Sequence, residues 1–224
     1  MIPRVLLDTA PMPGGGPELR LYRRGDEFQI MTGSVELMTS RAAGTEEALA
    51  RIAWERIQRR ARPAMLIGGL GMGFTLREAL AVLPADAEVT VSELVPAVVS
   101  WARGPLGHIH AGSLDDPRVT IAQEDVAATI GRSRARWDAI LLDIDNGPHA
   151  LVVESNDLIY ASEGLRAARE ALKPGGVLAI WSSNADAAFT RRLKAERFAV
   201  DEVRVRSAGR KGTRNHLWFA ARSR

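Results

Sequence analysis

The 224-residue sequence contains no cysteine, and only 5% of its residues are aromatic. Without cysteine the chain has no disulfide bond, no thiolate metal site and no cysteine nucleophile. A cysteine-free composition also fits the cytoplasm, which is the location that we expect. His108 and His110 have too few potential ligands near them in the sequence to indicate a metal site, so we expect no metal.

Long apolar runs are absent as well. The apolar residues that follow Met1 are too few for a signal peptide, and no later run approaches the length of a membrane span. Hydrophobic residues make up 46% of the chain and charged residues 25%, as in an ordinary globular protein. We expect no contact with a membrane, no internal repeat and a sizeable core.

Basic residues slightly outnumber acidic ones, which gives a net charge of +3 and a pI of about 9.8. Arginines gather in residues 59–62, 132–136 and 204–214. A basic face could attract nucleic acid or an anionic substrate. No aromatic residues interleave these runs, however, so we interpret them as solvated charges and expect no nucleic-acid partner.

The first 44 residues are expected to form a small β-region. Residues 1–17 read as an irregular arm, because proline and glycine crowd residues 11–17. Alternating apolar and polar residues then predict strands at 18–23, 27–31 and 35–39, separated by turns. The pattern is typical of an antiparallel β-meander.

Residues 45–224 alternate between strand and helix patterns and are expected to form the main domain. Helices are predicted from residue 45 up to Pro63 and at 75–83, 96–103, 125–131, 156–172 and 189–196, and strands at 64–68, 88–93, 118–122, 137–143, 177–181, 200–206 and 216–221. Residues 104–116 read as a long loop. Repeated strand–helix units with apolar strands indicate an α/β fold with a doubly wound, mostly parallel sheet, and the last strand pair adds an antiparallel edge.

The stretch from Met65 to Arg77 joins an apolar strand to a helix through alternating glycines, Gly69, Gly71 and Gly73. Glycine allows a tight turn and a close approach of the backbone to a ligand. The pattern therefore favours a nucleotide-like ligand at the end of a parallel strand. A glycine-rich turn that only closes a strand–helix junction is the alternative.

Acidic residues follow three successive strands after these glycines. Glu93 comes roughly 20 residues later, where a carboxylate can bind ribose hydroxyls. Asp125 follows the next strand, where a carboxylate can accept from an adenine amino group, and Asp143 ends the strand after that. Strand ends are often polar in any fold, but three acids in succession favour a site at the carboxyl edge of the sheet.

The glycine spacing differs from the G-x-G-x-x-G of nicotinamide-binding domains, which disfavours a dehydrogenase. It resembles the class I methyltransferase fold, a Rossmann-like doubly wound sheet whose ligand is S-adenosylmethionine or a relative. The run from Lys173 to Leu178 is also common in that superfamily. Within it, Ile67 to Glu78 resembles the glycine motif of the spermidine synthases, and residues 143–148 stand where that family has its Asp-rich loop.

The resemblance implies a set of site residues. The donor would be held by Gly68, Gly69, Leu70, Gly71, Gly73, Glu93, Leu94, Asp125, Val126 and Asp143. Of these, Glu93 would bind the ribose, Asp125 the adenine, and Asp143 would be the catalytic acid–base group that takes a proton from the attacking amine. Substrate contacts are expected from Glu46, Asp145, His149 and Tyr160.

Three positions depart from the family pattern. Met72 stands where the family has an aspartate that is expected to hold the aminopropyl ammonium. Residues 45–47, Thr-Glu-Glu, stand in place of the family's Tyr-His-Glu, and the Asp-rich loop is shorter between its acids. Glu46 is a hypothetical substitute anion for a cationic substrate.

We therefore expect a spermidine-synthase-like transferase of polyamine biosynthesis. It would move an aminopropyl group from decarboxylated S-adenosylmethionine to a small-molecule amine, without a metal. An S-adenosylmethionine-dependent methyltransferase is the first alternative, and a nucleoside-binding homologue without turnover is the second. The resemblance also implies a homodimer.

Overall fold

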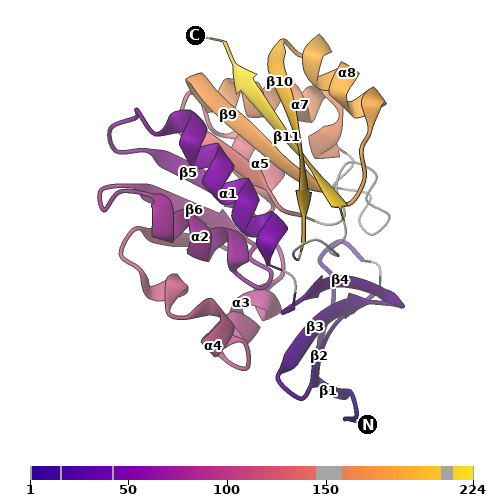
Figure 1. Ribbon diagram of the computed structural model, residues 1–224. Coiled ribbons are helices and arrows are strands. Elements are labelled where there is room, and N and C mark those ends of the chain that lie inside the picture. Colours follow the sequence, from indigo (N-terminus) through magenta and orange to yellow (C-terminus); the bar gives the residue numbers. More distant parts are fainter. Residues whose placement is uncertain (1, 16, 42, 145–157, 208–213, 224) are drawn as a thin grey trace.

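The computed structural model describes residues 2–15, 17–41, 43–144, 158–207 and 214–223. These residues form two β-sheets, one small and antiparallel, the other larger and flanked by helices (Figure 1). Within the described ranges, no helix is both long enough and apolar enough to cross a membrane.

The small sheet is formed by the N-terminal residues. Its strands are β1 (Val5–Ala10), β2 (Leu19–Arg24), β3 (Glu27–Thr32) and β4 (Val35–Thr39), paired antiparallel in that order. The predicted meander is confirmed, but the irregular arm over residues 1–17 is wrong. The proline- and glycine-rich run forms only the loop between Ala10 and Leu19. Residues Val5–Ala10, before that loop, form a strand that pairs antiparallel with β2.

The larger sheet has seven strands in the order β10-β11-β9-β8-β5-β6-β7. Their bounds are β5 (Ala64–Gly68), β6 (Glu88–Ser92), β7 (Val119–Ala122), β8 (Trp137–Leu142), β9 (Leu172–Ser182), β10 (Phe198–Arg206) and β11 (Arg214–Arg222). Strands β7, β6, β5, β8 and β9 run parallel, whereas β11 is antiparallel to both of its neighbours. The predicted fold class is confirmed, including the antiparallel edge at the C-terminus.

Helices cover both faces of this sheet (Figure 1). They are α1 (Gly44–Ile57), α2 (Phe74–Val82), α3 (Pro96–Arg103), α4 (Gly107–His110), α5 (Val126–Gly131), α7 (Ser162–Ala171) and α8 (Ala187–Ala195). Successive residues of β5 belong to two hydrophobic clusters on opposite faces of the sheet. Met65 belongs to the cluster formed with α1, α2, α3 and the small sheet. Leu66 belongs to the cluster formed with α5, α7 and α8. Both β5 and β8 are buried along their whole length, which explains their continuous apolar sequences.

Several predicted boundaries differ from the structure. The predicted loop 104–116 contains α4 and a 3-10 turn, Ser113–Asp115. Helix α1 ends at Ile57 rather than near Pro63. Arg62, directly before the proline, has a left-handed backbone (φ 49°), so the helix could not have continued to Pro63. Strand β9 begins at Leu172 instead of residue 177, and the Lys-Pro-Gly-Gly run forms an irregularity in its pairing with β8.

Strand β5 lies at the point where the chain changes direction across the sheet. The chain adds β6 and β7 on one side of β5 and then crosses to β8 on the other side. In sheets of this kind the loops after the two strands at such a point diverge and leave a crevice at their carboxyl ends. Gly68 ends β5 and Leu142 ends β8, so the glycine turn and Asp143 meet there.

Candidate active site

The glycine turn after β5 lies directly against the end of β8. Gly69, Gly71 and Gly73 all have left-handed backbones, with φ of 88°, 47° and 78°. A Cβ atom on Gly69 would lie 2.7 Å from the carbonyl oxygen of Asp143. The spacing of the glycines therefore follows from both the backbone angles and the close approach of two chain segments.

Glu93 stabilises this turn through hydrogen bonds to its backbone. One carboxylate oxygen accepts a hydrogen bond from the backbone N–H of Leu70 at 2.8 Å, and the other accepts from the N–H of Val95 at 2.8 Å. The side chain is buried, and burial raises the pKa of Glu93. Each carboxylate oxygen has a second acceptor position. The predicted ribose contact is therefore compatible with this arrangement.

Asp125 is the N-cap of α5, as its place before a short helix favours. Its Oδ1 accepts a 2.8 Å hydrogen bond from the N–H of Ala127. No described residue donates a hydrogen bond to Oδ2. The carboxylate lines the same pocket as Glu93, where Oδ2 is available to a ligand donor such as an amino group.

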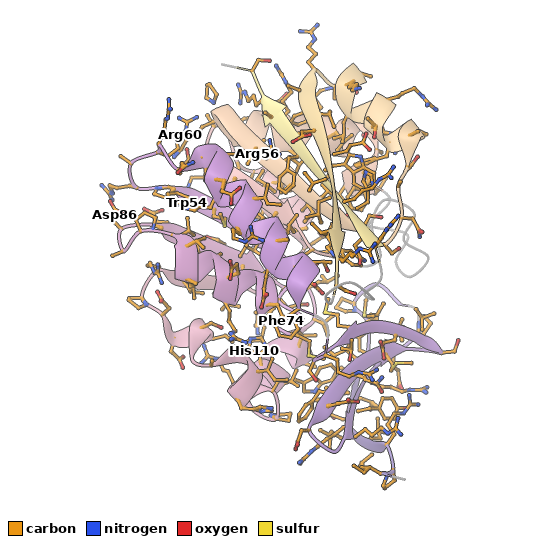
Figure 2. All side chains as sticks on the ribbon, viewed as in Figure 1. Trp54, Arg56, Arg60, Phe74, Asp86 and His110 are labelled. Carbon is orange, nitrogen blue, oxygen red and sulfur yellow. The ribbon has the colours of Figure 1, made fainter. Side chains whose placement is uncertain are left out.

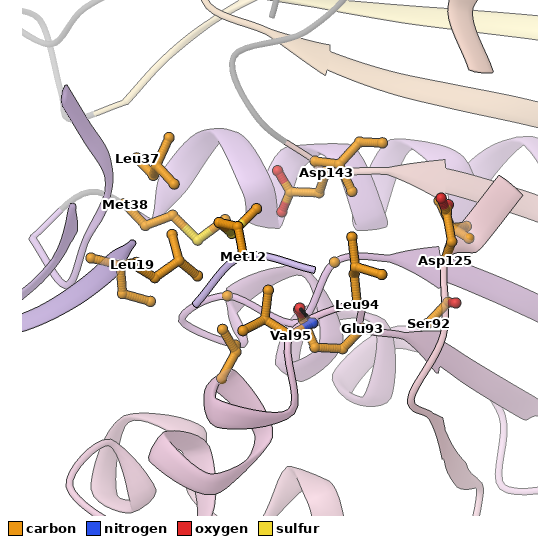
Figure 3. Close-up of a pocket in the computed structure, with 16 residues that line it drawn as sticks. Met12, Leu19, Leu37, Met38, Ser92, Glu93, Leu94, Val95, Asp125 and Asp143 are labelled. Atoms are coloured by element: carbon orange, nitrogen blue, oxygen red, sulfur yellow. Dashed lines mark hydrogen bonds between the residues drawn. The ribbon is translucent and has the colours of Figure 1, made fainter. Parts of the chain in front are cut away.

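These residues surround a pocket between the two sheets (Figure 3). It is lined by Met12, Leu19, Ile30, Leu37, Met38, Gly69, Gly71, Ser92, Glu93, Leu94, Val95, Val98, Asp125, Val126, Asp143 and Ile144. Seven of the predicted donor-binding residues are thus brought together, while Gly68, Leu70 and Gly73 belong to the adjoining turn. The wall contributed by the small sheet is apolar.

A second pocket adjoins the first on the other side of the glycine turn. It shares Leu37, Met38, Gly71 and Asp143 with the first pocket, and it adds Thr39, Glu46, Leu70, Met72, Gly73, Phe74 and Trp181. Asp143 therefore faces both pockets. An acid at a junction of this kind can reach groups that are bound on either side of it.

The environment of Asp143 raises the pKa of its carboxyl group. Burial and the negative charge of Glu46 raise the pKa of Asp143 to about 7, against the hydrogen bond from Thr75 Oγ1 to Asp143 Oδ2 (2.6 Å). Burial also raises the pKa of Glu46. A carboxyl group with a pKa near the working pH is suited to general acid–base catalysis.

The other predicted substrate residues have different outcomes. Glu46 lines the second pocket, as described above. Tyr160 is buried in the core on the opposite face of the sheet, where its ring packs edge-on against Phe189 at 5.7 Å, and it lines neither pocket. Asp145 and His149 lie outside the described residues.

Met72 is buried, and it contributes an apolar side chain to the second pocket. The position at which the family pattern has an acid is thus part of the hydrophobic core here. Among the described residues, no three His, Cys, Asp or Glu side chains converge to hold a metal ion.

Sequence reasoning missed several residues of the site. Leu19, Ile30 and Met38 come from the small sheet, and only their place on its inward face could have indicated them. Met12 comes from the loop that follows β1. His110 packs beneath Gly73, close to Phe74 (Figure 2). Burial lowers the pKa of His110 to about 4, so its ring is neutral under the glycine turn.

Comparisons with known proteins find related sequences and structures. Residues 43–191 match the model of the spermine/spermidine synthase domain. A polyamine aminopropyltransferase of Mycobacterium tuberculosis is 30% identical over 167 residues, which are 73% of this chain and 30% of that protein. One from Nitrosomonas europaea is 34% identical over 119 residues, covering 53% of this chain and 34% of the relative. The chain therefore spans about a third of the length of these relatives.

Solved structures share the fold. The spermidine synthase of Thermotoga maritima superposes with a TM-score of 0.78 at 18% identity, covering 97% of this chain and 73% of that one. A spermidine synthase in complex with the transition-state analogue AdoDATO gives 0.75 at 18% identity, with 97% and 72% covered. From the domain match, the chain belongs to the spermine/spermidine synthase family.

Proposed function

We propose that this protein is a transferase that moves an aminopropyl group from decarboxylated S-adenosylmethionine to an amine. The observation that carries the proposal is the position of Asp143, which faces both pockets and has a pKa of about 7. One pocket would hold the donor, and the other would admit the acceptor. The family membership and the names of the relatives support this assignment.

The donor pocket fits an adenosyl group. Its apolar lining, including Leu94, Val95 and Val126, suits the faces of a purine ring. Glu93 and Asp125 offer acceptor oxygens for the ribose hydroxyls and the adenine amino group, respectively. The glycine turn, from Gly68 to Gly73, lets the backbone approach the ligand closely.

The donor supplies an electrophilic carbon beside its sulfonium. A protonated amine has no lone pair, so Asp143 first accepts a proton from the ammonium group of the acceptor. The nitrogen then forms a bond to the electrophilic carbon, the carbon–sulfur bond breaks, and its electron pair stays on sulfur. The carboxylate of Asp143 also stabilises positive charge while the bond forms.

Calorimetry with decarboxylated and intact S-adenosylmethionine tests the proposal. We expect the decarboxylated form to bind more tightly. Binding of neither form would contradict the assignment of the donor pocket, and binding of only the intact form would contradict aminopropyl transfer. Asp143→Asn should lose turnover while still binding the donor; full turnover in this variant would exclude Asp143 as the base.

Methyl transfer from intact S-adenosylmethionine is the second candidate, and Met72 is the observation that favours it. Its buried thioether offers no anion to the aminopropyl ammonium. Product analysis with putrescine present and absent separates the two reactions. An aminopropylated product indicates polyamine synthesis, whereas a methylated product indicates the alternative.

The proposal has three further parts. We propose a homodimer, as the family resemblance implies, and a cytoplasmic location, which the absence of cysteine supports. We also propose residues 1–44 and 45–224 as separate domains, because each carries its own sheet. Size-exclusion chromatography with light scattering tests the dimer directly.

A further inference from the structure

Glu46 is held in place by two residues that link it to the far wall of the second pocket. The indole Nε1–H of Trp181 donates a 3.0 Å hydrogen bond to Thr45 Oγ1, and Thr45 Oγ1 donates at 2.6 Å to Glu46 Oε2. An indole N–H is only a donor. An ionised carboxylate can only accept, so the Thr45 hydroxyl, which accepts from Trp181, donates its hydrogen to Glu46.

Asp143 is held in a similar way from the other side of the pocket, through Thr75. Each of the two carboxylates thus has one oxygen held by a threonine hydroxyl. Because each carboxylate oxygen can accept two hydrogen bonds, both groups can also accept from a ligand. They lie close enough that the charge of Glu46 raises the pKa of Asp143. The described residues that line this pocket include no lysine, arginine or histidine.

The other residues that line the second pocket indicate which class of ligand it can bind. Leu37, Met72 and Phe74 make an apolar wall, and Trp181 adds an aromatic surface. Apolar walls around a carboxylate suit a methylene chain that ends in a cation, and an indole ring can also attract the cation. Divalent metal ions prefer more oxygen ligands than this wall offers.

We infer that Glu46 is the specificity-determining anion of the second pocket, that it binds an alkylammonium group, and that Thr45 and Trp181 are its positioning residues. The inference rests on the proposed function. The ammonium group belongs either to the aminopropyl chain of the donor or to the acceptor amine. In both cases Glu46, on α1, replaces the anion that is missing at Met72.

This arrangement has a consequence for donor choice. Intact S-adenosylmethionine carries a carboxylate beside its ammonium group, and this carboxylate would be repelled by Glu46 and Asp143. Decarboxylated S-adenosylmethionine lacks it. If Glu46 binds the donor, it therefore selects the decarboxylated form.

Calorimetry on the full chain and on Glu46→Gln distinguishes the two sources of the ammonium. If Glu46 binds the donor, the variant binds decarboxylated S-adenosylmethionine about tenfold more weakly, or weaker still. The difference in affinity between the decarboxylated and the intact form also becomes smaller. If Glu46 binds the acceptor, donor affinity is unchanged and the KM for putrescine rises about tenfold. Unchanged donor affinity together with unchanged putrescine KM overturns the inference.

Matched variants test the positioning residues. Thr45→Val and Trp181→Phe should lower the affinity for the same ligand as Glu46→Gln does. Thr45→Ser keeps the hydroxyl and should bind that ligand as the unmodified protein does. Glu55→Gln removes an exposed acid from the same helix, outside the pocket, and should change nothing. Thermal unfolding of each variant separates lost binding from lost folding. A Thr45→Val variant that is folded and binds normally would contradict the positioning role.

The inference and the proposed function can fail separately. If the unmodified protein binds a sulfonium donor but Glu46→Gln behaves identically with donor and acceptor, only the inference is wrong. If the unmodified protein binds neither donor, the proposed function fails. Titration with putrescine alone then tests the ammonium site directly: weaker binding to Glu46→Gln supports it, and equal or absent binding to both proteins overturns it.

Discussion

The hydroxyl of Thr75 donates a 2.6 Å hydrogen bond to Oδ2 of Asp143 and so connects the first turn of α2 to the end of β8. This bond favours the charged form of the carboxyl group, while burial and Glu46 oppose it. The balance sets the fraction of Asp143 that is ready to accept a proton at neutral pH. Thr75 is therefore expected to tune the proposed base without contacting the reacting atoms.

Replacing Thr75 with valine should raise the pKa of Asp143 further. A hydrogen bond to a charged group contributes about 1.5–3 kcal/mol, and about 1.4 kcal/mol corresponds to one pH unit. The rise of kcat with pH should then move upward by about one pH unit or more, as measured by initial rates across a pH series. Thr75→Ser keeps the hydroxyl and is the control. Identical pH profiles for the valine variant and the original protein would contradict this role.

The pH dependence of turnover should show the ionisation of Asp143 itself. Since the deprotonated carboxylate is the active form, kcat/KM should rise with pH, with a midpoint near 7, and level off above it. Glu46→Gln removes the negative charge that helps to raise the pKa of Asp143, so the midpoint should move to lower pH. A midpoint that stays in place would mean that Glu46 does not act on Asp143.

Much of the site could be predicted from the sequence because it lies on one edge of a regular sheet. Glycines after β5 and acids after β6 and β8 occupy fixed places once a parallel order is assumed, so Gly69, Glu93 and Asp143 were predicted together. The immediate partners of Glu93 were not predictable. Its bonds to Leu70 and Val95 depend on the conformation of two turns, which the residue pattern does not specify.

Two features could not be predicted from the sequence: the pocket wall next to the small sheet and the position of Tyr160 in the core. Met12, in the loop after β1, and Met38, on β4, line the pocket only because the small sheet packs against the larger one. This packing is a tertiary relationship without a local signal. Tyr160 precedes α7, near the predicted loop, but its ring packs with Phe189 on the other face of the sheet. A place near the site in sequence did not determine the direction of the side chain.

Glu93→Gln should destabilise the fold as well as weaken donor binding. The amide has one acceptor oxygen, so its NH2 group would face the N–H of either Leu70 or Val95 and leave that buried group unpaired. We expect a loss of about 1.5–3 kcal/mol in the free energy of unfolding, measured with urea. Glu88→Gln, at the exposed start of β6, the strand that precedes Glu93, breaks a surface ion pair with Arg136 and should cost at most about 1 kcal/mol. Equal losses in the two variants would show that Glu93 does not fasten the glycine turn.

Gly69→Ala should damage the site because two chain segments meet there. Its φ of 88° disfavours any residue with a Cβ atom, and the new methyl group would lie 2.7 Å from the carbonyl oxygen of Asp143. Gly14→Ala is a matched control, since its φ is 86° but no atom lies within 4 Å of the added Cβ. The left-handed backbone alone costs about 1–2 kcal/mol, so Gly14→Ala should lose that much stability. Gly69→Ala should lose about 1–3 kcal/mol more through the steric conflict. Because the conflict displaces the glycine turn that lines the donor pocket, donor affinity measured by calorimetry should fall in this variant alone. If both variants lost the same stability and bound the donor equally, the close approach of the glycine turn to Asp143 would not matter for the site.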